Sequence, residues 1–142
     1  MKDPLSKRER SALMSKVRSR GNQSTEKAVE SILRANKITG WRKHPKNVIG
    51  RPDFYFPKVR LAVFVDGCFW HACPKCGRIP KSRINFWATK IAGNRQRDNR
   101  IRRRLWRTRF AVMRIWEHEL RRISWVKRLQ AKILKLTVTL PD

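Results

Sequence analysis

Apolar residues in this chain fall into short continuous runs, separated by polar segments that carry prolines and glycines. Two such runs, Asp53–Phe56 and Leu61–Val65, flank the dipeptide Pro57-Lys58 and predict a β-hairpin. Leu61–Val65 is apolar at every position, which is typical of a strand buried on both faces. A third strand is predicted over Phe110–Trp116.

Helical spacing of apolar residues surrounds these strands. A first helix is predicted from Ser24 or Thr25 to about residue 36, after which the chain to residue 50 is rich in turn formers. A second helix is predicted from Asn85 to about Trp106, and Ser124 caps a third. The inward positions are Ala28, Val29, Ile32 and Leu33 in the first helix, and Val126, Leu129, Ile133 and Leu136 in the last. This order predicts an α/β fold with a central mixed sheet flanked by helices.

The charge balance indicates the kind of partner. The chain has 36 Lys and Arg against 10 Asp and Glu, a formal net charge of +26 over 142 residues. A compact body with this charge repels itself unless a polyanion is near, and nucleic acid is the obvious polyanion. A membrane surface is a weaker alternative, because no apolar stretch approaches the roughly 20 residues that span a bilayer. The length predicts a single domain, 1–142, with a basic N-terminal arm over 1–22.

Cysteine usage fits a reducing compartment. Cys68, Cys73 and Cys76 lie within one short segment, and an odd number of cysteines argues against a disulfide framework. The first ten residues lack the apolar core of a secretory signal. A cytoplasmic location, associated with the nucleoid, is therefore expected.

The few carboxylates stand at the ends of predicted strands. Asp53 follows Pro52 at the head of the hairpin, where many metal-dependent nucleases place their first Mg²⁺ ligand. Pro52 is expected to hold Arg51 in an extended conformation. The second strand lacks the Asp/Glu-x-Lys of the usual nuclease hairpin, so the chain is either a variant nuclease or not a nuclease of this kind. Asp66, before Gly67, fits a metal ligand or a turn equally well.

The histidines leave alternatives open. His71, at the end of the loop after the second strand, suits a general base on an attacking water. It suits a zinc ligand equally, given Cys68 and Cys73 nearby. His44 lies in a Lys/Pro-rich loop and is interpreted as a phosphate neighbour or as a residue without a specific role. Asp98 lies among arginines, which favours an ion pair on a basic helix.

Four segments together resemble a known family. They are GRPDF (50–54), DGCFWHACPKCGRIPKS (66–82), FWATKIAGNRQRD (86–98) and VMRIWEHEL (112–120). In order and spacing they are similar to the very short patch repair (Vsr-type) DNA mismatch endonucleases, from about Ser6 to Leu120. The resemblance implies a restriction-endonuclease-like core with a zinc-stabilised loop. It also implies a Mg²⁺-dependent single-strand nick 5′ to the thymine of a T:G mismatch in double-stranded DNA.

The resemblance also assigns roles to individual residues. Asp53 falls on the family's metal-binding aspartate, His71 on its catalytic histidine and Asp98 on an acid that supports that histidine. Glu26 falls on a further acid of the catalytic site. The main-chain carbonyl at the position of Val65 is a metal ligand in the family, which accounts for the missing Asp/Glu-x-Lys. Since family members can do without an acid at the position of Asp66, that residue is interpreted as a turn or secondary residue.

Family members also carry a structural zinc. Cys68 and Cys73 match two of its ligands, and His118 stands where a member has a cysteine. A zinc-binding histidine of some members is absent from the segment around Cys73, and Cys76 is its natural substitute. Three thiolates and one imidazole are a standard tetrahedral zinc set. The alternative is three reduced thiols that hold no metal.

The aromatic and basic residues predict the DNA contacts. Phe69, Trp70 and Trp87 match aromatics that wedge into the duplex beside the mismatch, where unstacking is easiest, whereas Trp116 and Trp125 are assigned to the core. The segment 95–109 holds eight arginines, of which one part is expected to track phosphates and the rest to be solvated. The predicted DNA-binding residues are Phe69, Trp70, Trp87, Arg51, Arg95 and Arg97.

Two other classes of function remain possible at this point. One is a related restriction or repair nuclease that cuts other mismatches or matched DNA. The other is a basic nucleic-acid-binding protein without catalysis. A nick needs one active site, so a monomer is expected, and other mismatch-repair proteins are conceivable partners.

Overall fold

The fold is built on a mixed sheet, as predicted. The structure is a computed structural model that describes residues 25–76 and 81–139. Its sheet has the order β1-β2-β3-β4, in which β3 and β4 are parallel and the other neighbours antiparallel. The strands are β1 (Arg42–Lys43), β2 (Phe54–Phe56), β3 (Leu61–Asp66) and β4 (Ala111–Trp116).

The predicted hairpin is confirmed. β2 and β3 pair antiparallel with Phe54 opposite Val63, and the 3-10 turn η1 (Pro57–Val59) joins them. Pro57 suits the start of this turn because its fixed φ needs no adjustment there. Arg60 completes the turn in the left-handed region, at a φ of 53°. β3 is buried on both faces along nearly its whole length.

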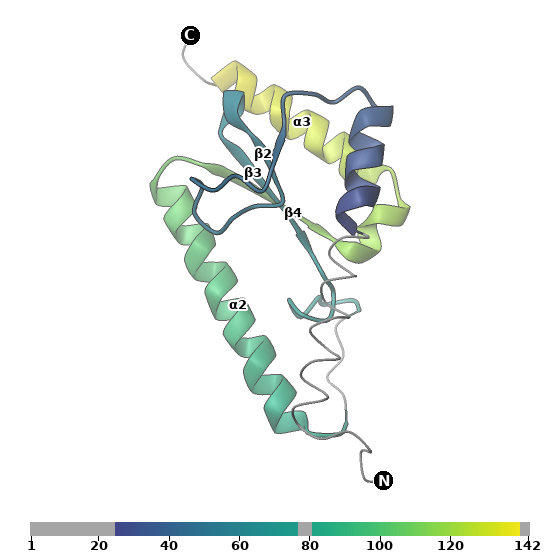
Figure 1. The fold of residues 1–142 in the computed structure, drawn as a ribbon, viewed down its shortest axis with the longest axis vertical. Helices are drawn as coiled ribbons and strands as arrows, with labels where there is room; N and C mark the ends of the chain where they lie inside the picture. Colours follow the sequence, from purple (N-terminus) through teal and green to yellow (C-terminus); the bar gives the residue numbers. More distant parts are fainter. Residues whose placement is uncertain (1–24, 77–80, 140–142) are drawn as a thin grey trace.

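Helices cover both faces of the sheet (Figure 1). The chain is helical over 25–35, then in α2 (Ile84–Arg107) and α3 (Ser124–Thr139). The helix at 25–35 and α3 share one core cluster with β2, β3 and β4, built around Val29, Leu33 and Trp125. Leu105 of α2 packs in a second cluster on the opposite face. The expected α/β class is therefore confirmed, and Trp125 is a core residue as predicted.

The helix α2 touches the rest of the protein along a narrow stripe. Its less exposed positions are spaced by three and four residues in turn, as in one face of a helix. With Ala88, which lies beside this stripe, they are Trp87, Ile91, Asn94, Asp98, Ile101 and Leu105. Two polar residues, Asn94 and Asp98, thus face inward in the middle of a long basic helix, where they reach the loop after β3.

Some local predictions differ from the structure. The segment predicted to be turn-rich contains the short strand β1, and α3 begins at Ser124, whose predecessor Ile123 accepts the first helical hydrogen bonds through its carbonyl. Ser124 thus stands inside the helix rather than at its cap. The predicted arm over 1–22 and the alternative cap Ser24 lie outside the described residues. Among the described helices, none is long and apolar enough to cross a membrane.

Candidate functional site

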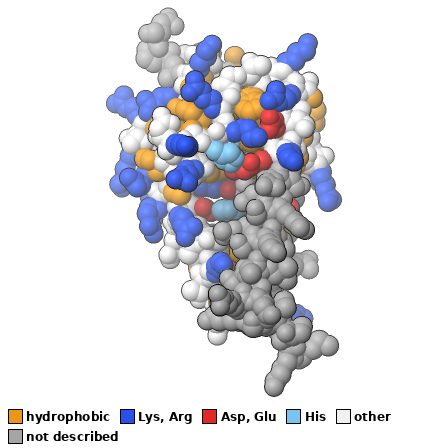
Figure 2. All heavy atoms as spheres, in the orientation of Figure 1, with side chains coloured by type: hydrophobic (Ala, Val, Ile, Leu, Met, Phe, Trp, Pro, Cys, Tyr) orange, Lys and Arg blue, Asp and Glu red, His pale blue; other side chains and the backbone are white. Residues whose placement is uncertain are grey.

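The candidate site lies where β3 and β4 end side by side. Asp66, the last residue of β3, is in register with Trp116, the last residue of β4. The chain beyond β3 runs in turns through residues 67–76. Figure 2 shows acidic and histidine side chains gathered near the middle of one face, with Lys and Arg side chains around them. In a chain with 10 acids and 36 Lys and Arg, this gathering is selective.

A first cluster joins three elements around Asp53. Asp53 Oδ2 accepts a 2.7 Å hydrogen bond from the backbone N–H of Val65 on β3. Glu26, from the first described helix, is hydrogen bonded to His44 Nε2 at 2.9 Å. Ligand atoms of Glu26, His44 and Asp53 all lie within 4.8 Å of one another, close enough to share one metal ion.

The electrostatics of this cluster favour a cation. Burial is the main cause that raises the pKa of Asp53, the Val65 N–H and His44 oppose the rise, and the Glu26 carboxylate adds to it, so that the pKa is about 6. Two carboxylates that face each other in a partly dry site repel, and a bound cation removes that repulsion.

The backbone before Asp53 is tightly bent. Gly50 and Arg51 both have positive φ, 83° and 47°. Gly50 lies directly against Ile101 of α2, so a side chain there would collide with the helix. The prediction that Pro52 holds Arg51 extended is therefore wrong. The Arg51 N–H instead donates to the carbonyl of Val48 and closes a turn that delivers Asp53 to the head of β2.

A second cluster surrounds His71. His71 Nδ1 lies 2.5 Å from Asp98 Oδ2 on α2, which agrees with the pairing of these two residues that the family resemblance implies. Asp98 therefore faces the loop rather than only its neighbouring arginines. Asn94, one turn earlier on α2, donates to the carbonyl of Trp70 and so fixes the residue before His71.

Asp66 belongs to this second cluster as the last residue of β3, so the turn interpretation is wrong and the alternative interpretation as a secondary residue remains. It is 3% exposed, and its Oδ2 accepts a 2.7 Å hydrogen bond from Arg114 Nη1 of β4. Its Oδ1 lies 4.0 Å from His71 Nε2, and Arg114 Nη2 lies 4.0 Å from Asp98 Oδ1. β3 thus extends one residue beyond the apolar run and ends at Asp66. Burial of this carboxylate is tolerated because Arg114 compensates its charge.

These neighbours set the charge state of His71. Burial acts to lower its pKa, but the hydrogen bond to Asp98 and the charge of Asp66 outweigh burial and Arg114, so that the pKa is raised. The side chains line an open cavity of about 180 Å³ together with Arg95, Arg102 and Trp116. Trp116 was assigned to the core, but it is half-buried and forms part of this wall.

Sulfur ligands gather on the other side of the same loop. Cys68 Sγ and Cys73 Sγ lie 3.3 Å and 3.4 Å from His118 Nδ1, which is carried by the 3-10 helix η2 (Glu117–Arg121). With Cys76, their ligand atoms fall within 4.8 Å of one another. A tetrahedral zinc with ordinary bond lengths separates S and N by about 3.5 Å. The predicted set of three cysteines and His118 is thus brought together as a possible metal site, and His71 is not part of it.

The thiols differ in acidity. Burial raises the pKa of Cys68 to about 12. Burial acts in the same direction on Cys73, but the backbone N–H groups of Cys76 and Lys75 outweigh it and lower the pKa of that thiol. A metal that binds here must displace the proton of Cys68.

The predicted wedge residues form one aromatic cluster beside this loop. Phe69, Trp70 and Trp87 have ring centroids 5.1–6.1 Å apart in edge-to-face contact, and Phe86 adds a fourth ring. Trp87 is 7% exposed, whereas Phe69 and Trp70 are half-buried. In this conformation Trp87 supports the two loop aromatics from α2. Lys90 lies over the Trp70 ring at 5.4 Å.

The arginines of α2 are all exposed. Among the described residues, none of the seven pairs with a carboxylate within the 4.0 Å of an ion pair. Arg95 and Arg102 line the His71 cavity, whereas Arg97 lies on an exposed position outside it. Basic side chains over paired carboxylates and imidazoles, on an α/β sheet, indicate an enzyme that acts on phosphodiesters.

Comparison with known proteins identifies the family. The sequence model of the family "DNA mismatch endonuclease Vsr" matches residues 2–77. The Type II nicking enzyme V.XorIIP of Xanthomonas oryzae pv. oryzae is 47% identical over 70% of this chain and 73% of its own length. The Type II nicking enzyme V.NmeDIP of Neisseria meningitidis serogroup C is 35% identical, over 72% and 70%. The DNA mismatch endonuclease Vsr of Escherichia coli K12 is 34% identical, over 70% and 64%. The chain belongs to the Vsr family of DNA mismatch endonucleases.

Two residues of the site escaped sequence reasoning. His44 pairs with Glu26 because β1 runs beside β2, and the His44 N–H donates to the Asp53 carbonyl at 3.3 Å. β1 is two exposed basic residues with no apolar alternation, so no pattern indicated it. Arg114 is the one charged residue in the otherwise apolar strand β4, and a charge inside a predicted buried strand was the available signal.

Proposed function

We propose that this protein is a Mg²⁺-dependent mismatch endonuclease that nicks one DNA strand 5′ to the thymine of a T:G pair. The observation that carries the proposal is the His71–Asp98 pair beside the Asp53 cluster at the end of β3. Membership in the Vsr family supports the endonuclease activity. The proposed setting is a restriction-endonuclease-like core in a single domain, monomeric and nucleoid-associated in the cytoplasm.

The Asp53 cluster fits a divalent cation. Oxygen ligands from two carboxylates suit Mg²⁺, which usually keeps waters and substrate phosphate in its remaining positions. The raised pKa of Asp53 and its proximity to Glu26 are the signs of a site that a cation completes. Asp53, Glu26 and the main chain of Val65 would hold the ion, with His44 as a further ligand or as the partner that orients Glu26. When bound, the ion neutralises the scissile phosphate and the leaving oxygen.

His71 is proposed as the base that takes the proton of the attacking water. Its Nδ1 is held by Asp98, so the free Nε2 is the atom that accepts the proton. The same contact fixes the ring orientation and stabilises the imidazolium that forms. Asp66 adds a second negative charge near Nε2, and its ion pair with Arg114 partly neutralises that charge. Asp66 and Arg114 are therefore proposed as positioning residues rather than as catalytic ones.

The loop between β3 and α2 is proposed to join cleavage to mismatch recognition. The Cys68, Cys73, Cys76 and His118 set would hold Zn²⁺ and anchor both ends of the turn that carries Phe69, Trp70 and His71. Phe69 and Trp70, backed by Trp87, would enter the stack beside a weakened pair at a cost of a few kcal/mol. Because His71 follows Trp70 directly, insertion of the Trp70 ring into the DNA would also position His71, the proposed general base.

A panel of duplexes tests the proposal and its alternatives. Purified protein is incubated with Mg²⁺ and end-labelled duplexes that carry T:G, another mismatch or a matched pair at one position. The proposal predicts a single nick, in the thymine strand, in the T:G duplex. Cleavage of matched DNA would instead indicate a restriction-type nuclease, and binding without cleavage would indicate a non-catalytic DNA-binding protein.

A further inference from the structure

A second cavity lies along α2, away from the Asp53 and His71 clusters. It encloses about 460 Å³, within the range of pockets that hold small ligands. Its lining is Arg102, Arg103, Trp106, Phe110, Ala111, Val112 and Lys132. The proposed catalytic and zinc residues do not take part in it.

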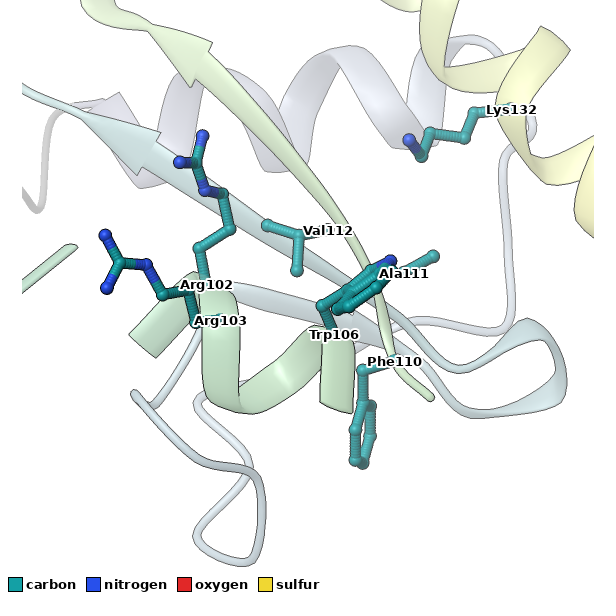
Figure 3. Close-up of a pocket in the computed structure, with 7 residues that line it drawn as sticks. All are labelled: Arg102, Arg103, Trp106, Phe110, Ala111, Val112 and Lys132. Carbon is teal, nitrogen blue, oxygen red and sulfur yellow. The ribbon is translucent and has the colours of Figure 1, made fainter. Parts of the chain in front are cut away.

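The cavity sits at the edge of the sheet, between the two helical layers. Figure 3 shows Arg102, Arg103 and Trp106 on α2, Ala111 and Val112 on β4, and Lys132 reaching toward them from α3. β4 is the last strand in the order of the described sheet. The cavity therefore lies beside the β4 edge of the described sheet.

The chemistry of its walls selects a nucleotide. Three basic side chains surround it, and no carboxylate is among the residues that line it. Trp106 is 78% exposed, although a tryptophan placed for stability would be covered. An exposed aromatic ring between cations is the arrangement that stacks an unpaired base while the cations hold its phosphates. An acidic peptide would also interact with the three cationic side chains, but it need not contain a group that stacks on a flat exposed ring.

The cavity shares one lining residue with the hollow around His71. Arg102 lines both hollows, and α2 presents one side to both of them, through Arg95 and Asn99 at the His71 end and Trp106 at the other. Along β4, Val112 and Trp116 mark the two hollows and are four residues apart, which is about 13 Å. At about 3.4 Å per base step of one strand, the two hollows are about four steps apart.

We propose that the Trp106 cavity binds an unstacked nucleotide of the substrate DNA about four steps from the scissile phosphate, with its base on Trp106 and its phosphates on Arg102, Arg103 and Lys132. The position on the DNA rests on the proposed function, whereas the affinity for a single strand does not. The cavity thereby gives the protein a grip on a strand that opens near the mismatch or at the nick.

Binding of a single strand tests the cavity without catalysis. The probe is a short fluorescein-labelled single-stranded oligothymidylate, followed by anisotropy with Mg²⁺ omitted. W106A and K132A should each weaken binding by about tenfold, and W106F should restore most of it. The matched controls V138A and K135A replace an exposed apolar residue and an exposed lysine of α3 outside the cavity, and should bind as wild type does. Equal binding by W106A, K132A and the controls would overturn the proposal.

A photocrosslink tests the position on the DNA. 5-Iododeoxyuridine is placed at successive positions of the nicked strand in a T:G duplex, and the crosslinked peptide is identified by mass spectrometry. A crosslink to Trp106 at about four steps from the nick is expected. Crosslinks at Phe69 or Trp70 without any at Trp106 would overturn it. The proposal would also be overturned if an acidic aromatic peptide bound the cavity and oligothymidylate did not, which would make the cavity a protein-docking site. If wild type nicks no duplex but W106A still loses the oligonucleotide, the proposed function fails and the cavity stands.

Discussion

Arg114 Nη1 donates to Asp66 Oδ2 over 2.7 Å, across the ends of two parallel strands. The pair lies on the α2 side of the sheet, where Arg114 also covers the Phe64 ring at 4.6 Å. One carboxylate oxygen faces the guanidinium and the other faces His71 at 4.0 Å. The same ion pair therefore holds the sheet end together and sets the field at the proposed base.

Removing Arg114 alone should be strongly destabilising, and the losses from removing Arg114 and Asp66 should not add. R114A leaves Asp66 buried with an uncompensated charge, so the free energy of unfolding should fall by about 3 kcal/mol. In a double-mutant cycle with D66A, measured by urea denaturation, the double variant should lose less than the sum of the single losses. R128A is the matched control, because its ion pair with Glu119 is half exposed and contributes under about 1 kcal/mol. Additive losses would show that Asp66 and Arg114 do not act as a pair.

The pH dependence of nicking should report His71. A base must be neutral to accept a proton, and the pKa of His71 is raised, so activity should rise with pH and reach its midpoint above the pKa of about 6.5 of an ordinary histidine. D98N removes the hydrogen bond that raises the pKa, and the midpoint should move to lower pH. D98E keeps a carboxylate and should keep the midpoint high. The measurement is the single-turnover nicking rate against pH, and an unmoved midpoint in D98N would contradict the assignment.

Metal affinity should depend on the Asp53 cluster even without turnover. D53N and E26Q should each weaken Mg²⁺ or Mn²⁺ binding by at least about tenfold, because each removes a hard oxygen ligand. Isothermal titration of the protein without DNA measures this. E30Q is the control, since Glu30 is on the same helix as Glu26 but pairs with Arg34 and with Lys43 of β1, outside the cluster. If D53N binds the ion as wild type does, the metal lies elsewhere.

The cysteine cluster should hold one zinc per chain. Elemental analysis is expected to find it, and a strong chelator should lower the thermal midpoint of unfolding, because the metal ties the loop to η2. C76S tests the ligand that departs from the family pattern, and it should lower zinc affinity by at least about tenfold. A zinc-free protein that is fully folded and active would rule the site out.

Particular residues show how much of the candidate site could be predicted from the sequence. Cys76 and His118 are 42 positions apart in the chain, yet ligand count and family pattern placed them together, and the structure brings their ligand atoms to one point. Asp98 could be paired with His71 only through the family resemblance, because its arginine neighbours by themselves favoured an ion pair on a basic helix. These successes rest on chemistry that demands several groups at one place.

The misses come from contacts that no local pattern encodes. His44 meets Glu26 only through the register of a two-residue strand. Arg51 adopts a positive φ in a turn whose preceding residue, Gly50, lies against Ile101 of α2, a tertiary contact. The dipeptide Asp66-Gly67 indicated a turn, but Arg114 on another strand makes burial of that carboxylate tolerable. Each case is a long-range partner overriding a local preference.

The most direct test of the account is the nicking rate of H71A and D53N on a T:G duplex under single-turnover conditions. Binding of each variant to the same duplex is confirmed first, so that only chemistry is compared. Loss of the base should slow nicking by about 10²–10⁴-fold, and loss of the metal ligand should slow it at least as much, with affinity for the duplex kept. A variant that binds the duplex and nicks it at the wild-type rate would contradict the central claim that Asp53 and His71 form the cleavage centre.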